Sequence, residues 1–256
     1  MLTPDGLRSI ASLISAVVWP LFAFAVLIVL APQLRDLVSR LTDFEAFGVK
    51  AKVSQNLKEA AKAAERAAEP SSGPTPGELH RAFVVEQLTS NTDTSFIRKQ
   101  VDDLATEYER VRASMPASDT RTRAMEVVVA KMRTIGRAAF PLRYDLSISP
   151  SPGRRLQAIV SLQLIPDFDD FLDWLAERVS KEVPFLQYQA LVALNGAATD
   201  ARAAAHLPAL ERALAVAQVA RPSFGRDTGR TRQLDTLGTR VQQLHASTTS
   251  ALTEAR

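Results

Sequence analysis

The chain has 256 residues, of which 46% are hydrophobic and 23% are charged, a composition typical of a globular protein and not of a disordered one. Lysine and arginine number 31 against 28 aspartate and glutamate, and the resulting net charge of +3 is too small to indicate nucleic-acid binding, so we expect no nucleic-acid partner. The absence of cysteine excludes disulfide bonds, a thiolate nucleophile and a cysteine-based zinc site.

An uncharged segment near the N-terminus is long enough to cross a membrane. From Ile10 to Ala31 no residue carries a formal charge, and 13 of these 22 residues are Ile, Leu, Val or Phe. At about 1.5 Å per residue this segment makes a helix of about 33 Å, against a hydrocarbon thickness of about 30 Å. We therefore expect a transmembrane anchor within residues 1–33 that contacts the lipid bilayer through residues 10–31. A cleaved signal peptide is the alternative, although the apolar run continues beyond Ala25.

The charges that flank this segment predict its orientation. Arg8 precedes it, whereas Arg35, Arg40, Lys50 and Lys52 follow it closely. Basic residues collect on the cytoplasmic side of a membrane. We therefore expect a single-pass protein of the inner (plasma) membrane with a cytoplasmic C-terminal domain, whose four membrane-proximal basic residues lie near anionic headgroups. An envelope structural protein whose domain faces the periplasm is the alternative.

Residues 34–69 are predicted to form a membrane-proximal stalk. Apolar residues recur at helical spacing over 34–44, which indicates an amphipathic helix. Apolar and polar residues alternate over 47–53, which indicates a short extended piece. Ser54 is the predicted N-cap of an Ala-rich helix that runs to about Ala68, and its weak apolar face predicts that it is solvated or packs only on a partner.

A linker rich in proline and glycine, residues 70–77, separates the stalk from a predicted helical hairpin, residues 78–145. Both hairpin helices carry an apolar seam with steps of three and four residues, and Asp119 or Thr120 is the predicted cap of the second. The seam residues are Ile97, Val101, Leu104, Tyr108, Val111 and Met115 in the first helix, and Met125, Val128, Met132, Ile135 and Ala139 in the second. We expect the two helices to pack on each other; a homodimeric coiled coil through residues 97–115 is the alternative.

The C-terminal half contains a repeated helical pattern. The segment 156–162 (LQAIVSL) matches 188–194 (YQALVAL) at four of seven positions, 32 residues later. The predicted helices that follow the first copy begin near Asp169, at Pro184 and at Asp200. Helix pairs of this length that cannot bury their apolar faces alone are typical of stacked α-solenoids.

This pattern, over about residues 152–219, resembles HEAT repeats, and the resemblance implies a HEAT-like α-α repeat domain over residues 146–246; a generic helical bundle that happens to repeat is the alternative. Parts of the region, such as 149–156, are also similar to helical modules that we associate with bacterial conflict and signalling proteins, which implies an interaction role. A last helix is predicted over Thr231–His245, followed by a flexible tail, 247–256. The predicted fold class is all-α: a transmembrane helix, a helical hairpin and a HEAT-like repeat domain.

Two clusters of charged residues are candidate sites. Five basic residues of the second hairpin helix would form a docking face for an acidic partner or for lipid headgroups, or else a solvated surface. They are Arg121, Arg123, Lys131, Arg133 and Arg137. The second cluster comprises the four aspartates of 167–173, which favour a helix N-terminus by capping or, in the alternative, hold a divalent metal.

No catalytic constellation and no phosphate-binding motif emerges from the sequence, so we expect no cofactor and no enzymatic activity. The predicted function is that of a membrane-anchored scaffold or adaptor that binds a protein partner. The alternatives are a membrane-bound helical hydrolase that uses the carboxylates of Asp167–Asp173 and the periplasm-facing structural protein.

Overall fold

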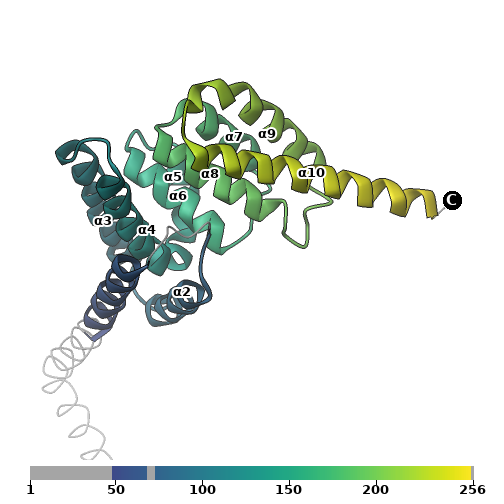
Figure 1. Cartoon of the computed structure of the whole chain (residues 1–256). Helices are drawn as coiled ribbons and strands as arrows, with labels where there is room; N and C mark the ends of the chain where they lie inside the picture. The colour runs from purple at the N-terminus through teal and green to yellow at the C-terminus, as the bar shows by residue number, and fades with distance from the viewer. Residues whose placement is uncertain (1–47, 68–72, 255–256) are drawn as a thin grey trace, which may run out of the picture. The chain divides into compact units, whose positions relative to one another are not determined.

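The computed structural model describes residues 48–67 and 73–254 (Figure 1). Contacts divide the chain into two units, 1–51 and 52–256. The predicted membrane anchor, the amphipathic helix after it, and the basic residues Arg35 and Arg40 lie outside the described residues. Within the described part, no helix combines the length and the apolar character needed to cross a bilayer.

The all-α fold class is confirmed, since every regular element of the described residues is a helix. The first element is a helix over residues 48–66, which contains the Ala-rich helix predicted from the sequence. It is followed by α2 (Pro76–Thr89), α3 (Thr94–Ser114), α4 (Asp119–Ala139), the 3-10 turn η1 (Phe140–Leu142), α5 (Arg143–Ser147), α6 (Pro152–Leu164), α7 (Leu172–Lys181), α8 (Pro184–Ala197), α9 (Leu207–Ala220), the 3-10 turn η2 (Arg221–Phe224) and α10 (Thr228–Glu254).

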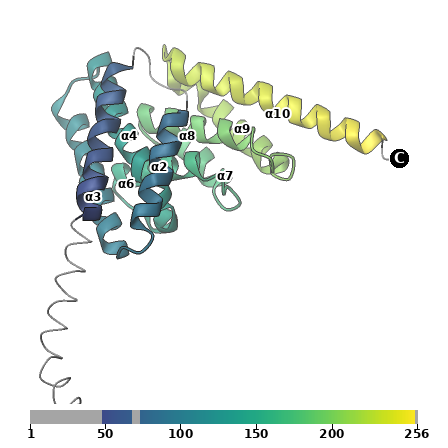
Figure 2. The ribbon, with the colours of Figure 1, turned by 90° about the horizontal axis from the view of Figure 1, so that it is seen from below.

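Alternate helices of the second unit form two rows. In the even-numbered row α2 packs on α4, α4 on α6, α6 on α8, and α8 on α10. In the odd-numbered row α3 covers α4 and α6, α5 covers α6, α7 covers α8 and α9, and α9 covers α10. The succession from α2 to α10 can be followed in Figures 1 and 2. The result is a repeat-like helical bundle, in which each pair of helices buries its apolar face on the next pair.

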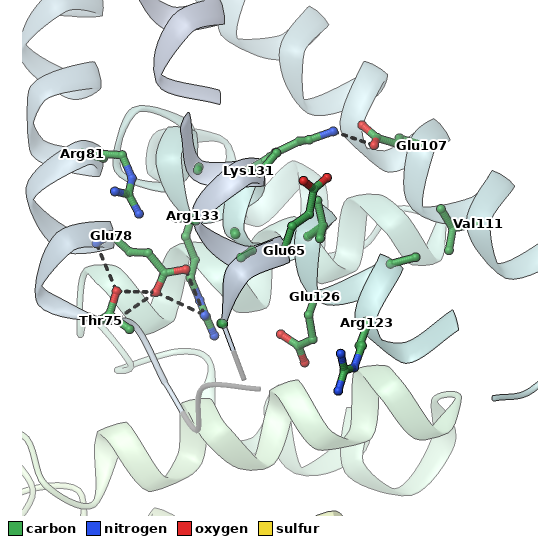
Figure 3. A pocket seen from close by; sticks show the side chains of 18 residues that line it. Glu65, Thr75, Glu78, Arg81, Glu107, Val111, Arg123, Glu126, Lys131 and Arg133 are labelled. Carbon is green, nitrogen blue, oxygen red and sulfur yellow. Dashed lines mark hydrogen bonds and ion pairs between the residues drawn. The ribbon is translucent and has the colours of Figure 1, made fainter. Parts of the chain in front are cut away.

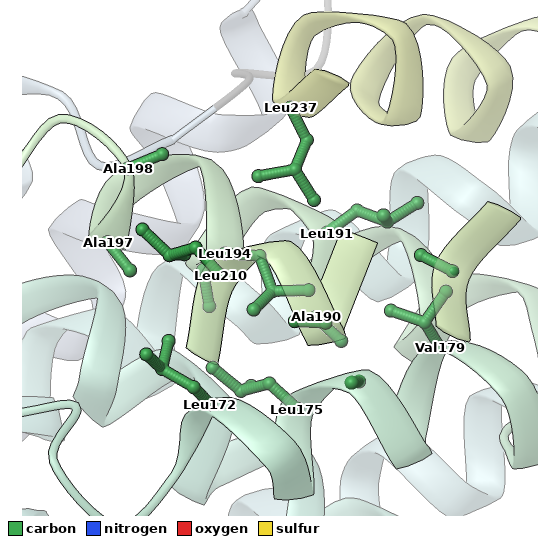
Figure 4. Packing of buried hydrophobic residues seen from close by; sticks show 14 of the residues in the cluster. Leu172, Leu175, Val179, Ala190, Leu191, Leu194, Ala197, Ala198, Leu210 and Leu237 are labelled. Carbon is green, nitrogen blue, oxygen red and sulfur yellow. The ribbon is translucent and has the colours of Figure 1, made fainter. Parts of the chain in front are cut away.

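The apolar core of the C-terminal half joins α7, α8, α9 and α10 (Figure 4). Leu175 of α7, Leu194 of α8, Leu210 of α9 and Leu237 of α10 are each fully buried in it. Burial of one such side chain stabilises a fold by about 1.5–3 kcal/mol. Because α8 touches α6, α7 and α10, its residues are buried on almost every side, which explains its nearly unbroken apolar sequence.

The predicted helical hairpin is present as α3 and α4. Ile97, Val101, Leu104 and Tyr108 are buried on the side where α3 meets α4 and α6. The cap of α4 is one residue earlier than predicted, because the Ser118 hydroxyl accepts a hydrogen bond from the Arg121 amide at 3.2 Å. A homodimer through residues 97–115 would need the outer face of α3, since this seam is covered within the chain.

The stalk predictions for residues 47–54 are wrong. Residues 48–66 are helical, so 48–53 are not extended and Ser54 lies inside the helix instead of capping it. An alternation of seven residues is too short to oppose the helical preference of alanine and lysine. Val53 and Ala60, two turns apart on one face, are fully buried, so the Ala-rich helix packs on its own chain.

The predicted limits of three helices in the C-terminal half also differ. Helix α7 begins at Leu172 instead of Asp169, and α9 begins at Leu207 instead of Asp200. Pro208 explains the second shift, because proline is disfavoured inside a helix but fits its first turn. The last helix, α10, is longer than predicted at both ends and remains helical to Glu254, through most of the predicted tail.

A glycine allows two helices of the first half to approach closely. A Cβ atom on Gly153, at the start of α6, would lie 2.5 Å from the carbonyl oxygen and 2.6 Å from the Cα of Ala105 in α3. These are backbone atoms that cannot move aside. The contact is reinforced by Glu109 of α3, whose carboxylate accepts hydrogen bonds from the Ser151 hydroxyl at 2.6 Å and the Gly153 amide at 3.3 Å.

We therefore expect Gly153→Ala to lower the free energy of unfolding by at least about 2 kcal/mol, because α3 and α6 must separate to admit the methyl group. Gly196→Ala is the matched control: a Cβ atom at this position of α8 would have no neighbour within 4 Å, so the substitution should be neutral or stabilise by about 0.5–1 kcal/mol. Chemical denaturation of the two full-length variants measures both effects. Equal stabilities would contradict the close approach.

Candidate binding groove

A cavity of about 520 Å³ is bounded by the Ala-rich helix, α2, α3 and α4 (Figure 3). We call it the first cavity. Small alanine side chains of the Ala-rich helix and α4 leave this space open. Charged side chains line the rest of it. They are Glu65, Glu78, Glu107 and Glu126, with Arg81, Arg123, Lys131 and Arg133.

A buried ion pair lies at the wall of this cavity. The side chains of Arg133 and Glu78 are only 3% and 8% exposed, and Arg133 Nη1 lies 3.3 Å from Glu78 Oε1. Glu78 is also the third residue of α2, where its carboxylate accepts a hydrogen bond from the Thr75 amide at 2.8 Å in a capping box. One carboxylate thus fixes the start of α2 and holds it to α4.

Buried amide side chains continue this interaction along the even-numbered row. Arg133 Nη2 donates to Gln163 Oε1 of α6 at 3.4 Å, and Gln163 Nε2 donates to Gln189 Oε1 of α8 at 3.1 Å. Gln189 Nε2 in turn donates to Glu126 Oε1 of α4 at 3.3 Å. The polar chain therefore connects α2, α4, α6 and α8, and its last carboxylate faces the cavity.

Glu126 is a carboxyl group without an ion-pair partner among the described residues. Burial raises its pKa from 4.5 to about 7; the nearby Arg133 opposes this rise and Glu78 adds to it. In Figure 3 Glu126 and Arg123 extend from α4 on the same side. At neutral pH the carboxyl group is therefore partly protonated, and it can both donate and accept a hydrogen bond.

Glu126 lines both the first cavity and a second one, of about 370 Å³, between α3, α4, α8 and the start of α10. Tyr188, Gly229 and Arg232 line both the second cavity and a third one, of about 450 Å³. The three cavities are therefore neighbours that share wall residues, and we call them together the binding groove. It runs beside the even-numbered helices.

Tyr188 lies at the centre of the binding groove. Burial raises the pKa of its hydroxyl, the Glu126 carboxylate raises it further, and a hydrogen bond with Gln233 and the charge of Arg232 lower it. The opposing influences show that an acidic and a basic group of the groove both lie near this hydroxyl. Tyr188 therefore stays protonated and offers a hydrogen-bond donor to whatever occupies the groove.

The start of α10 is held against α8 by a buried arginine. Arg230 is 5% exposed; its Nε donates to Asp227 at 2.9 Å, its Nη2 donates to the Phe224 carbonyl at 3.1 Å, and its Nη1 donates to Gln187 of α8. The guanidinium also stacks on the Phe224 ring, 4.7 Å from its centroid. These contacts fix Gly229 and Arg232 at the border of the groove.

The predicted basic docking face of α4 is not one surface. Arg133 is buried against Glu78 at the wall of the first cavity, so the prediction that it lies on an exposed docking face is wrong; the packing of α4 against α2 covers it. Lys131 pairs with Glu107 at 2.6 Å and Arg137 pairs with Glu86 at 2.6 Å. Arg121 and Arg123 line the groove instead, in its second and first cavities.

The two remaining membrane-proximal basic residues, Lys50 and Lys52, are exposed. Sequence reasoning did not single out Glu78, Gln163 and Tyr188, which line the groove, or Gln189, which hydrogen-bonds with Gln163 and Glu126. Tyr188 belongs to the repeated segment 188–194, where the pattern indicates only a place in the repeat. The glutamines carry no signal, because a polar residue in a helix is on average a surface residue.

The four aspartates of 167–173 do not form a joint site. Asp167 pairs with Arg143 at 3.2 Å, Asp170 accepts from the Tyr144 hydroxyl at 2.7 Å, and Asp173 pairs with Arg212 at 3.1 Å. Asp169 lies 3.3 Å from His206. They do not cap α7 either, since its N-cap is Phe171 without a side-chain hydrogen bond. Over 48–67 and 73–254, no cluster of three or more acidic or histidine side chains is arranged to hold a metal ion.

Comparison of the chain with protein-family models, with curated proteins and with solved structures finds no significant match. The groove must therefore be interpreted from its own residues.

Removal of one member of the buried ion pair leaves the other charge without a partner. We expect Arg133→Met to lower the free energy of unfolding by about 3–5 kcal/mol. The double variant E78Q/R133M, which removes both charges and keeps an amide in the capping box, should recover part of this loss. Arg98→Met is the control, because the Arg98–Asp145 pair is 49% and 65% exposed and should contribute at most about 1 kcal/mol. Denaturant unfolding that ranks R98M as the more damaging change would contradict the role of the pair.

The raised pKa of Glu126 predicts a pH-dependent stability. In the unfolded chain this carboxyl loses its proton near pH 4.5, and in the fold it loses it near pH 7. Its contribution to stability is therefore complete below about pH 4.5 and is lost as the pH rises through 7. Relative to Glu126→Gln, we expect the native chain to lose about 2–3 kcal/mol between pH 5 and pH 8.

Thermal unfolding at the two pH values measures this difference. Glu65→Gln, an exposed carboxylate at the first cavity, is the control and should leave the pH profile of the native chain unchanged. If the stabilities of E126Q and the native chain changed in parallel with pH, burial would not be retaining the proton on the Glu126 carboxyl group.

Proposed function

We propose that this protein is a membrane-anchored adaptor whose helical-repeat domain binds another protein in the binding groove. The single observation that carries the proposal is the groove itself, three neighbouring cavities that share wall residues and border α2, α4, α8 and α10 of one row. Stacked helical repeats typically bind extended segments along such a row. Each cavity has the volume of a small-molecule pocket, and most proteins have few such pockets. Three of them in succession therefore suit an extended polypeptide better than a compact metabolite.

The interpretation of the domain as HEAT-like belongs to this proposal. It is supported by the match between 156–162 and 188–194, which occupy equivalent places in α6 and α8. It is supported also by the packing of α6 on α8 and of α7 on α9, as in two successive helix pairs. In this interpretation α2 to α5 extend the same two rows in the N-terminal direction.

The anchor of the adaptor is the uncharged segment of residues 10–31, and the domain lies on the cytoplasmic side of the inner membrane. The support is the length and apolar composition of the segment and the basic residues that follow it. Attachment to a membrane confines the protein to a thin layer and raises its local concentration, so a groove of modest affinity suffices to capture a partner.

The adaptor is tested by photo-crosslinking in cells that express the full-length protein. A photoreactive amino acid replaces Thr122, at the second cavity, or Thr236, at the third, and in the control it replaces Ser180, an exposed residue of α7. We expect a covalent adduct with one and the same protein from the two groove positions, in the membrane fraction after carbonate washing. Adducts from all three positions alike, or from none, would refute the proposal.

A further inference from the structure

The second cavity of the binding groove carries a concentration of positive charge. Arg112 of α3, Arg121 of α4 and Arg232 of α10 line it from three directions. None of the three has a carboxylate partner among residues 48–67 and 73–254; Arg121 donates instead to the Met115 carbonyl, at 3.3 Å. Most other arginines of the domain do have such a partner, as Arg133 illustrates.

Two acidic residues, Asp227 and Glu126, line the second cavity beside these arginines, and both have other hydrogen-bond partners. Asp227 is engaged by Arg230, with 2.9 Å between Oδ2 and Nε, and by the amide of Arg230 at 3.0 Å. Glu126 accepts from Gln189 and is partly protonated near neutral pH. The guanidinium groups of the cavity therefore have no counter-charge within the described part of the domain that would satisfy them.

The third cavity extends the positive charge. It is lined by Arg232 and Arg240, and no aspartate or glutamate is among its lining residues in the part of the chain that the structure describes. Arg240 donates from Nη1 to the Asn195 carbonyl at 2.8 Å, which positions its guanidinium beside the groove. Over the second and third cavities together, four arginines face two carboxyl groups.

An apolar patch lies next to the arginines. Met125 is 3% and Phe185 is 9% exposed, and both line the second cavity together with Val183 and Pro184. The Phe185 ring is itself held by Tyr108, with 5.9 Å between the ring centroids. A ligand that fits this cavity thus combines an apolar group with nearby negative charges.

We propose that the occupant of the groove is an extended, acidic protein segment, whose aspartate or glutamate carboxylates bind Arg112, Arg121 and Arg232 while an apolar side chain rests on Phe185. The inference depends on the proposed function and names the chemistry of its partner. A guanidinium group matches the two oxygens of a carboxylate with two parallel N–H donors. Tyr188 adds a neutral donor between the second and third cavities.

A protein segment is favoured over a nucleic acid by the same residues. A phosphate backbone needs a long series of cations and repels carboxylates. Here Glu126 and Asp227 stay within the groove, and the first cavity holds as many acidic as basic residues. An acidic segment with an apolar side chain avoids these positions and uses both the arginines and the apolar patch.

The test is a selection of random twelve-residue peptides, displayed on phage, against the full-length protein in detergent micelles. We expect the enriched peptides to be rich in Asp and Glu with at least one large apolar residue.

Synthetic copies of these peptides should bind the Arg232→Gln variant about tenfold or more weakly than they bind the native chain. Arg232 is exposed, so this variant keeps its fold, and R112Q is the second variant. Arg226→Gln, an exposed arginine outside the second cavity, is the matched control and should bind normally.

The outcomes separate the two proposals. Enriched peptides that are not acidic, or whose affinity is the same for R232Q and R226Q, overturn the acidic segment while the groove remains a protein-binding site. A single-stranded oligonucleotide that binds more tightly than every selected peptide, and loses affinity in R232Q, also overturns it. If no peptide is enriched, the acidic segment is refuted, and crosslinking at Thr122 and Thr236 then decides whether the groove binds a folded protein instead.

Discussion

The ion pair between Glu78 and Arg133 is the interaction on which the N-terminal half of the domain depends. Two charges are taken out of water there, and their mutual attraction and hydrogen bonds must offset a desolvation cost of several kcal/mol per ion. The carboxylate is bound by Arg133 and by the Thr75 amide, and the guanidinium also binds Gln163, while its buried Nε has no hydrogen-bond partner among the described residues. Helix capping, the contact of α2 with α4, and the approach of α6 are thus coupled through one group of atoms.

This coupling gives the two halves of the domain a different character. Around α7, α8 and α9 the helices are held mainly by leucine and alanine side chains, whose apolar contacts have no preferred direction, and Arg230 and Asn195 add polar bonds between α8 and α10. Around α2, α4 and α6 the helices are held partly by directional polar bonds, which specify one arrangement because unpaired polar atoms are costly to bury. We infer that these polar bonds fix the arrangement of the helices around the first cavity, and the apolar half supplies most of the stability.

The positive charge of the groove arises because the arginines near it differ in their partners. Arg133 and Arg230 are engaged by carboxylates within the domain and serve as supports. Arg112 and Arg232 line the groove near such supports but have no carboxylate of their own among the described residues. A surface arginine ordinarily remains hydrated at little cost. Several of them at one cavity, beside an apolar patch, create a site whose charge a ligand can complete.

Most of the helices, and the repeat, follow from local patterns in the sequence. Apolar spacing over 97–115 and 125–139 predicts the α3–α4 hairpin, and the match of 156–162 with 188–194 predicts the repeated packing of α6 and α8, because helical periodicity is a local property of the chain. Local signals are insufficient where a short pattern competes with the helical preference of its neighbours, which is why Ser54 resembles a cap but lies inside a helix.

Which charged residues are buried and paired, and which line the groove, depends on the tertiary structure. Glu78 and Arg133 are 55 positions apart, and the sequence groups Arg133 with the surface residues of α4 because its neighbours are basic. Whether such a side chain meets water or a carboxylate depends on which helix packs against it, and no spacing within α4 encodes that choice. The same reason applies to the second cavity of the groove, whose residues come from α3, α4, α8 and α10 and meet only once the rows are assembled.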